Sequence, residues 1–135
     1  MEGADSQSNH LSGSQAEDLA CEYLLDQGLQ LLIKNFRTHR GEIDLIMQQA
    51  DCIVFVEVRF RRSQAFGGAL ASITASKCRR LNAAAASYLQ ASGYPTASPT
   101  RFDAVAIAPA PTRGGVDPQT LRKGYAIDWI QNIIM

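Results

Sequence analysis

The stretches GEIDLI (Gly41–Ile46) and FVEVRFRR (Phe55–Arg62) decide the fold, because both combine a strand-like apolar pattern with charged residues in the middle. β-branched and aromatic residues favour strands, and the short segment QAD between them is typical of a hairpin turn. Charged side chains are rarely fully buried unless they are paired or hold an ion. The charges in this hairpin therefore either face water or form a site.

Alternation of side chains along each strand separates the charges from the core. One face of the second strand is apolar and consists of Val54, Val56, Val58 and Phe60. Glu57, Arg59 and Arg61 belong to the other face. If Ala50 and Asp51 form a two-residue turn, Gln49 pairs with Cys52, and the register then places Asp44 opposite Glu57 and Glu42 opposite Arg59.

Two carboxylates directly opposite each other on a sheet repel, by about 4 kcal/mol at 4 Å and an effective dielectric near 20. Three arrangements would offset this repulsion between Asp44 and Glu57. A divalent cation could bind both groups, since hard cations prefer carboxylate oxygens. Arg59 or Arg61 could bond them instead, or solvent could screen them. The spacing alone leaves all three open.

Hydrophobic periodicity and turn residues predict the remaining elements. The sequence favours a helix over residues 14–27, a strand over 29–37, a second helix over 74–91, a strand over 101–108 and a further strand in YAIDWIQ. The resulting α-β-β-β-α-β order predicts one α/β domain over residues 12–135, in which helices flank a central sheet. Residues 1–11 are polar and are expected to form a flexible tail.

Composition narrows the class of protein. The 135 residues carry 13 basic and 13 acidic side chains, but six acidic and no basic residues fall within 1–29, whereas nine basic and four acidic residues fall within 30–80. The basic middle could face a polyanion, or it could be a solvated surface that offsets the acidic start. Three cysteines without a CxxC spacing disfavour a disulfide scaffold or a zinc site. Without a signal peptide or an apolar run of membrane-spanning length, we expect a cytoplasmic protein that does not enter a membrane.

Several motifs together resemble one known family. They are AEDLACEYLLDQG (Ala16–Gly28), NFRTHRGEIDLI (Asn35–Ile46), VFVEVRFR (Val54–Arg61), SKCRRLNAAAASYL (Ser76–Leu89) and RFDAVAI (Arg101–Ile107). In this combination the chain resembles the YraN-like family of small bacterial proteins. That family is similar to the PD-(D/E)XK nuclease superfamily and to archaeal Holliday-junction resolvases. The resemblance implies a restriction-endonuclease-like core with a central mixed sheet.

The resemblance also implies a function and a set of site residues. It implies a divalent-metal-dependent endonuclease that hydrolyses DNA phosphodiester bonds, with branched DNA as the substrate, Mg²⁺ or Mn²⁺ as the cofactor, and a homodimer as one arrangement. Asp44 matches the Asp of the superfamily motif, Glu57 its second acid and Glu17 a glutamate on the first helix. These three would bind metal and, together with Arg59, form the catalytic set. Arg59 stands where the superfamily motif has lysine.

That arginine keeps a second function open. Arginine cannot be deprotonated in proteins, so Arg59 could orient water or stabilise charge but could not act as a base. The alternative to an active nuclease is a catalytically impaired nucleic-acid-binding module of the same fold, or a protein-interaction domain with neither activity. Lys77 on the second helix is a candidate for the missing amine, with a solvated helix residue as its alternative.

Other candidate residues have structural alternatives as well. Glu17 lies three residues after Ser14 and could instead complete a helix-capping box. Asp103 could support the site or simply bond a neighbouring arginine. Basic residues that could contact a nucleic-acid backbone are Arg37, Arg40, Arg61, Arg62, Lys77 and Arg80. Contacts of this kind carry no sequence information, so we expect recognition of DNA structure rather than of base sequence.

Overall fold

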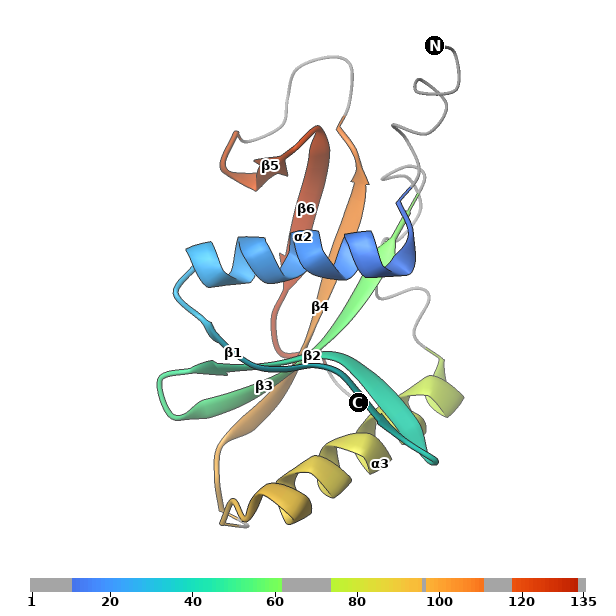
Figure 1. The fold of residues 1–135 in the computed structure, drawn as a ribbon, viewed down its shortest axis with the longest axis vertical. Coiled ribbons are helices and arrows are strands. Elements are labelled where there is room, and N and C mark those ends of the chain that lie inside the picture. The colour runs from blue at the N-terminus through green and yellow to red at the C-terminus, as the bar shows by residue number, and fades with distance from the viewer. Residues whose placement is uncertain (1–10, 62–73, 96, 111–117, 134–135) are drawn as a thin grey trace.

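The computed structural model describes residues 11–61, 74–95, 97–110 and 118–133 (Figure 1). In chain order the elements are α2 (Gly13–Asp26), β1 (Gln30–Thr38), β2 (Gly41–Gln49), β3 (Cys52–Phe60), α3 (Ala75–Ser92), β4 (Thr100–Pro109), the 3-10 helix η2 (Pro118–Thr120), β5 (Leu121–Arg122) and β6 (Tyr125–Ile130). The predicted α-β-β-β-α-β order is confirmed. The short β5 is an additional strand that the sequence analysis did not predict.

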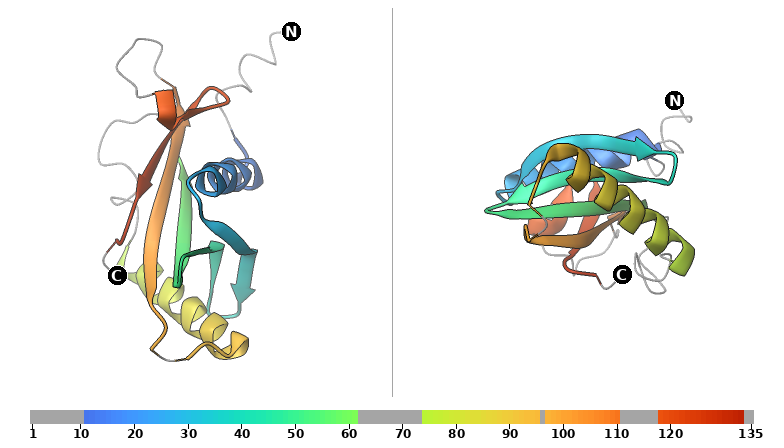
Figure 2. Two further views of the ribbon diagram at one scale, coloured as in Figure 1. Left: turned by 90° about the vertical axis from the view of Figure 1, so that its left-hand side faces the viewer. Right: turned by 90° about the horizontal axis from the view of Figure 1, so that it is seen from below.

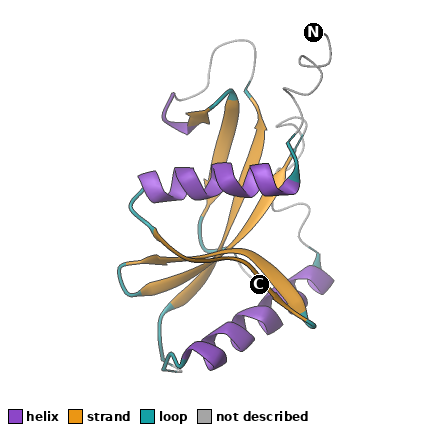
Figure 3. Cartoon of the chain, in the orientation of Figure 1, coloured by secondary structure: helices purple, strands orange, loops and turns teal. Residues whose placement is uncertain are grey.

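The strands of the described segments form one mixed sheet in the order β1-β2-β3-β4-β6-β5 (Figure 3). β3 and β4 are parallel and are connected through α3, whereas the other neighbours are antiparallel. A parallel pair needs a long crossover, and α3 provides it. This confirms the predicted central mixed sheet with flanking helices.

The hairpin of β2 and β3 has the predicted turn. Gln49 pairs with Cys52, and the same register continues to Leu45 and Val56. Ala50 in the turn has φ 53°, a left-handed conformation that a tight two-residue turn requires. One further step in this register would place Asp44 opposite Glu57.

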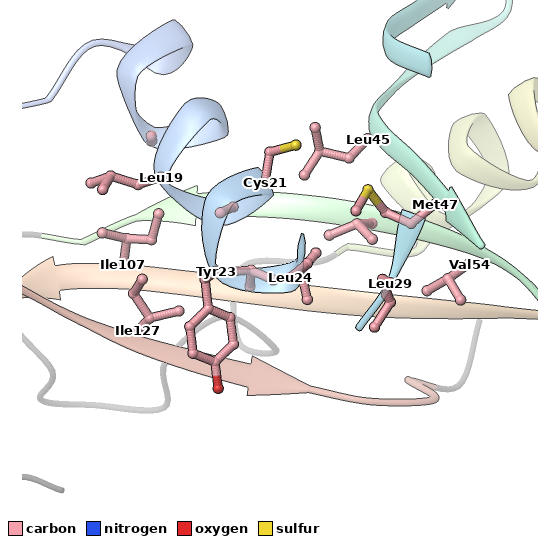
Figure 4. Packing of buried hydrophobic residues seen from close by; sticks show 14 of the residues in the cluster. Leu19, Cys21, Tyr23, Leu24, Leu29, Leu45, Met47, Val54, Ile107 and Ile127 are labelled. Atoms are coloured by element: carbon pink, nitrogen blue, oxygen red, sulfur yellow. The ribbon is translucent and has the colours of Figure 1, made fainter. Parts of the chain in front are cut away.

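β3 is covered on both faces, so its charged face is not a solvent face. Val54 and Val56 pack under α2 in a cluster that includes Leu24 and Ile107 (Figure 4). On the opposite face Ile53 and Phe55 pack with residues of α3, and both are about 1% exposed. The views in Figure 2 show α2 beside one half of the sheet and α3 across its other end. The predicted alternation of side chains along β3 is confirmed, and the structure adds that the face carrying Glu57 is also covered.

Both helices begin and end at identifiable signals. Thr74 caps α3 by accepting a hydrogen bond from the backbone N–H of Lys77 at 3.1 Å. Gly93 ends α3 with φ 74°, which glycine adopts without steric cost. α2 is followed by Gly28 at φ 99°, directly after the predicted end of the helix at residue 27. None of the helices in the described ranges is long and apolar enough to cross a lipid bilayer.

Asp103 is fully buried on β4 and anchors the end of the chain. It accepts hydrogen bonds from Arg101, from Nε1 of Trp129 at 2.9 Å and from the backbone N–H of Asn132 at 2.9 Å. The expectation that it bonds a neighbouring arginine is confirmed. Its partners tie β6 and the following residues to β4, which is a structural role.

The predicted tail lies outside the described residues except for Leu11, so it remains a prediction.

Gly41 begins β2 where the β1–β2 turn approaches α3 most closely. A Cβ atom at this position would lie 2.4 Å from the backbone carbonyl oxygen of Arg80. Backbone cannot move aside as a flexible side chain can, so we predict that Gly41→Ala lowers the free energy of unfolding by about 1–3 kcal/mol. Urea denaturation measures the change.

The matched control for this prediction is Gly13→Ala at the first position of α2, where an added Cβ meets nothing within 4 Å. It should leave stability within about 0.5 kcal/mol of wild type. Equal stabilities for the two variants would contradict a steric requirement for glycine at position 41.

Candidate functional site

The hairpin opens at the point where the acidic residues lie. Strand pairing between β2 and β3 extends to Leu45 and Val56. Beyond it, Oδ2 of Asp44 accepts a hydrogen bond from the backbone N–H of Val58 at 2.8 Å. Figure 1 shows β2 following β1 toward α3, while β3 continues beside β4 and α2. Where the two strands separate, the carboxylate of Asp44 therefore replaces the next backbone hydrogen bond between them.

A cavity of about 470 Å³ occupies this opening. Its lining comes from the start of α2, the β1–β2 turn, both hairpin strands and the start of α3. The charged residues that line it are Glu17, Arg40, Glu42, Asp44, Glu57, Arg59, Lys77 and Arg80. All four residues of the predicted catalytic set, Glu17, Asp44, Glu57 and Arg59, are therefore brought together in one cavity.

Glu57 is the most deeply buried charge of the cavity, with its side chain 6% exposed. Its Oε2 lies 2.8 Å from Nζ of Lys77 and 3.0 Å from Nη2 of Arg59. Of the three arrangements considered for the hairpin carboxylates, solvent screening is wrong for Glu57, and bonding by Arg59 is confirmed. A charge buried this deeply needs partners of this kind.

Asp44 has the strongest electrostatic perturbation described for the cavity. Burial is the largest cause, and the charge of Glu57 is the next; together with Glu17 they raise the pKa of Asp44 from 3.8 to about 7, against the opposing hydrogen bond from Val58. A carboxyl group with this pKa is partly protonated at neutral pH. A cation bound beside it would favour the ionised form.

Glu17 belongs to the cavity rather than to the helix cap. The capping box of α2 consists of Ser12 and Gln15, whose side chains bond each other's backbone N–H groups at 3.1 and 2.9 Å. The predicted box between Ser14 and Glu17 is wrong because α2 begins at Gly13, so Ser14 is already inside the helix. Glu17 instead lines the cavity beside Asp44 and contributes to its raised pKa.

The donor set fits a hard divalent cation that keeps part of its water shell. Asp44 and Glu57 offer carboxylate oxygens on adjacent strands, and Mg²⁺ in proteins often takes only one or two carboxylates. Over the described ranges, no group of three or more His, Cys, Asp or Glu side chains is arranged to hold a metal. A dedicated three-carboxylate cage is therefore not present there, and Glu17 lines the same cavity as the two strand carboxylates.

The predicted phosphate-contacting residues separate into two groups. Arg40, Lys77 and Arg80 line the cavity. Arg37 does not, since its side chain is 70% exposed and pairs with Glu42 across β1 and β2 at 3.4 Å. Glu42 was predicted to lie opposite Arg59, but it pairs with Arg37 instead. Arg61 follows β3 outside the cavity lining, and Arg62 lies outside the described residues.

Part of the basic middle segment neutralises the acidic first helix. Lys34 on β1 forms an ion pair with Asp18 on α2. Arg122 and Lys123 pair with Asp26 and Glu22 of the same helix. The ion pair of Lys34 supports the second explanation of the charge asymmetry, an offset of the acidic start, whereas a contact of the basic middle with a polyanion stays a prediction.

Sequence reasoning missed two contributors to the site. The first is the backbone N–H of Val58, for which no residue pattern gives a signal. The second is Thr38, whose hydroxyl accepts hydrogen bonds from the N–H groups of Arg40 and Gly41 at 3.1 and 3.2 Å. This side chain shapes the β1–β2 turn that carries Arg40 and exposed His39 to the cavity. The THRG sequence is the available signal, because threonine hydroxyls often bond turn backbone.

The raised pKa of Asp44 predicts how stability depends on pH. Between about pH 4 and 7 the folded protein holds a proton on Asp44 that the unfolded chain has released, so the contribution of Asp44 to stability falls as pH rises through this range. We expect the free energy of unfolding of wild type, relative to Asp44→Asn, to decrease over that range in metal-free buffer. Urea denaturation at several pH values measures it.

Divalent metal should act in the opposite sense, because a carboxylate must be deprotonated to bind it. Stabilisation of wild type by Mg²⁺ should be larger above pH 7 than below it. A stability difference between wild type and Asp44→Asn that is independent of pH would contradict the raised pKa.

Comparison with known proteins identifies relatives over most of the chain. A UPF0102 protein of Pseudomonas aeruginosa (strain LESB58) is 46% identical over 128 residues, which cover 95% of each chain. A UPF0102 protein of Nitrosococcus oceani is 45% identical over 116 residues, or 86% of this chain and 92% of the relative. One of Pseudomonas putida is 51% identical over 96 residues, or 71% and 78% of the two chains.

A family model gives the same result. The model of the uncharacterised protein family UPF0102 matches residues 16–107, a range that contains Glu17, Asp44, Glu57 and Lys77. These names state no activity. The chain belongs to the UPF0102 family, the YraN-like family that its motifs resemble.

Proposed function

We propose that the protein is a divalent-metal-dependent endonuclease that hydrolyses DNA phosphodiester bonds. The observation that carries the proposal is the meeting of Asp44 and Glu57 in one cavity where β2 and β3 separate, with cations around them. Carboxylates on adjacent strands supply oxygen ligands, and the cations are suited to a phosphate. Structural ion pairs alone would not require an open cavity beside them.

Each part of the cavity has a role in this reaction. Asp44 and Glu57 would hold Mg²⁺ or Mn²⁺, and Glu17 would join through water. When bound, such an ion lowers the pKa of an attacking water and neutralises charge on the phosphate. Arg40 and Arg80, which line the cavity from the β1–β2 turn and from α3, would position the phosphate backbone. Arg59 can stabilise developing negative charge as a fixed cation but cannot remove a proton.

The substrate follows from the type of contact available. The cations around the cavity would bind phosphates, which carry no base sequence. The sequence motifs resemble a family similar to junction-cleaving nucleases, and this resemblance favours branched DNA over a sequence-specific site. Shape recognition by the helices and turn around the cavity would provide the selectivity.

One observation favours a second candidate, a nucleic-acid-binding module without catalysis. Glu57 is neutralised by two cations of the chain itself, so the buried carboxylate is stable without a metal. In this case DNA would bind around the cavity through Arg40 and Arg80 and would not be cut. Binding without cleavage by the wild-type protein distinguishes the second candidate from the first.

The nuclease proposal predicts that purified protein with Mg²⁺ or Mn²⁺ nicks branched DNA faster than linear duplex. Asp44→Asn and Glu57→Gln should each lower the cleavage rate at least about 100-fold, because each removes a charge used for metal and transition-state stabilisation. Gel analysis of labelled four-way junctions measures the rate.

The control for cleavage is Asp51→Asn, which makes the same chemical change in the exposed turn at the other end of the same hairpin. It should cleave like wild type, and all variants should be purified in parallel to reveal contaminating nuclease. Equal rates for Asp44→Asn and Asp51→Asn would show that the activity does not come from this cavity.

Phosphate binding at the cavity is tested separately by neighbouring arginines of α3. Arg79 and Arg80 are both exposed, but only Arg80 lines the cavity. Arg80→Gln should weaken DNA binding in EDTA and reduce the slope of log K against log salt by about 1, the value for one phosphate contact. Arg79→Gln should leave the slope unchanged, and the reverse result would move the DNA path away from the cavity.

A further inference from the structure

We propose that Lys77 of α3 supplies the functional ammonium group of the site. It would take the role that a lysine at position 59 of β3 would have. The proposal rests on the proposed nuclease function and extends it to a residue outside the hairpin. It is carried by the contact between Nζ of Lys77 and Oε2 of Glu57 at 2.8 Å, made across the cavity from a different element.

Lys77 reaches the cavity because it continues the sheet-facing stripe of α3. Leu81, Ala84 and Ala85 are buried against Ile53 and Phe55 of β3, and Tyr88 packs on the same cluster. Residues four and seven positions apart lie on the same face of a helix, so Lys77 belongs to this stripe one turn before Leu81. A solvated lysine would lie on the opposite face, but Lys77 is 26% exposed.

Two contacts fix the position of this part of α3. Thr74 accepts a hydrogen bond from the backbone N–H of Lys77, which sets where the helix starts. The backbone of Arg80 lies directly against Gly41, which holds the helix against the turn before β2. The helix carrying Lys77 is thus held at the strand that carries Asp44.

The two cations at Glu57 differ in what they can do. Arg59 lies two residues after Glu57 on the same strand face, and its Nε is buried without a hydrogen-bond partner among the described residues. A guanidinium is a rigid planar fork, whereas an ammonium is a compact point charge with three donors on a flexible stem. Lys77 can therefore bond Glu57 and a phosphate oxygen at the same time, and it can turn between them.

In the reaction Lys77 would stabilise charge and position the phosphate. A bond forms between the water oxygen and phosphorus, and the bond to the leaving oxygen breaks. The proton of the attacking water passes to solvent water, and the leaving oxygen takes a proton from solvent water. The ammonium of Lys77 donates a hydrogen bond to the non-bridging oxygen on which negative charge grows. Arg59 then serves mainly to hold Glu57 as a carboxylate.

The test uses Lys77→Met, which keeps most of the aliphatic stem and leaves Arg59 to pair with Glu57, together with Lys77→Met/Arg59→Lys, which returns an ammonium to the strand. Thermal unfolding checks that each variant folds. Lys77→Gln, which keeps a donor without the charge, replaces Lys77→Met should that variant be unfolded. The measurements are the single-turnover cleavage rate at saturating junction DNA and the dissociation constant for the same DNA in EDTA.

We expect Lys77→Met to lower the single-turnover rate about 100-fold or more, and to weaken DNA binding by a much smaller factor than the loss of rate. The double variant should regain at least about ten-fold of the lost rate, because the ammonium returns to the same carboxylate. A residue that only stabilised the fold would not be rescued from a different element.

Three results would overturn the proposal: cleavage by Lys77→Met within about three-fold of wild type, a loss of rate no larger than the loss of DNA affinity, or no gain from Arg59→Lys in the double variant. In each of these the wild type still cleaves, so the nuclease function survives. A wild-type protein that binds junctions but never cleaves them fails the proposed function itself and this inference with it.

Discussion

The constraint on which the rest of the site depends is the burial of Glu57. β3 lies inside the sheet and is covered by helices on both faces, so a carboxylate there loses most of its hydration. The chain offsets that cost with two cations from different elements, Arg59 on the strand itself and Lys77 on α3. Removing one partner of a buried pair typically costs about 3–5 kcal/mol, so the position of α3 and the charge of Glu57 are mutually dependent.

The same burial explains the behaviour of Asp44. Both cations contact Oε2 of Glu57, whereas the carboxylate of Asp44 accepts a hydrogen bond from the backbone N–H of Val58. One hydrogen bond does not offset burial and the neighbouring negative charges, and the pKa of Asp44 rises to about 7. The site therefore has one carboxylate stabilised by the protein and one that gains most from a cation. This asymmetry is what a metal site needs if the fold is to be stable before the metal binds.

Much of this arrangement could be predicted from sequence because it follows from local rules. Alternation along the hairpin and a two-residue turn at Ala50 and Asp51 were enough to set the register that brings Asp44 toward Glu57. Helical spacing and the glycine stops located both helices to within one or two residues. The predictions of the element order and of the cavity residues depended on these local signals and on the family resemblance.

What could not be predicted depends on packing between distant segments. Nothing in the alternation of β3 indicates that its second face is covered by α3 rather than by water, and the capping box moved by two residues because Ser12 and Gln15 fit the same pattern as Ser14 and Glu17. Glu42 was assigned to Arg59 by extending the β2–β3 register, but the strands separate before that position, and β1 offers Arg37 instead. Each error concerns a choice between two locally equivalent partners, which only the tertiary structure decides.

The close contact between Gly41 and α3 connects the local sequence motif with the packing of distant segments. The glycine precedes the acidic strand in sequence, and its missing Cβ is what allows the backbone of Arg80 to lie against the β1–β2 turn. Lys77 and Arg80, three residues apart, then line the cavity from α3. The motif GEIDLI thus includes a steric requirement along with its acidic residues. The glycine lets α3 approach, and α3 brings the ammonium of Lys77 to Glu57. This ammonium offsets the cost of burying the carboxylate. A substitution at Gly41 should therefore act on the chemistry through the position of Lys77, although residue 41 itself carries no functional group.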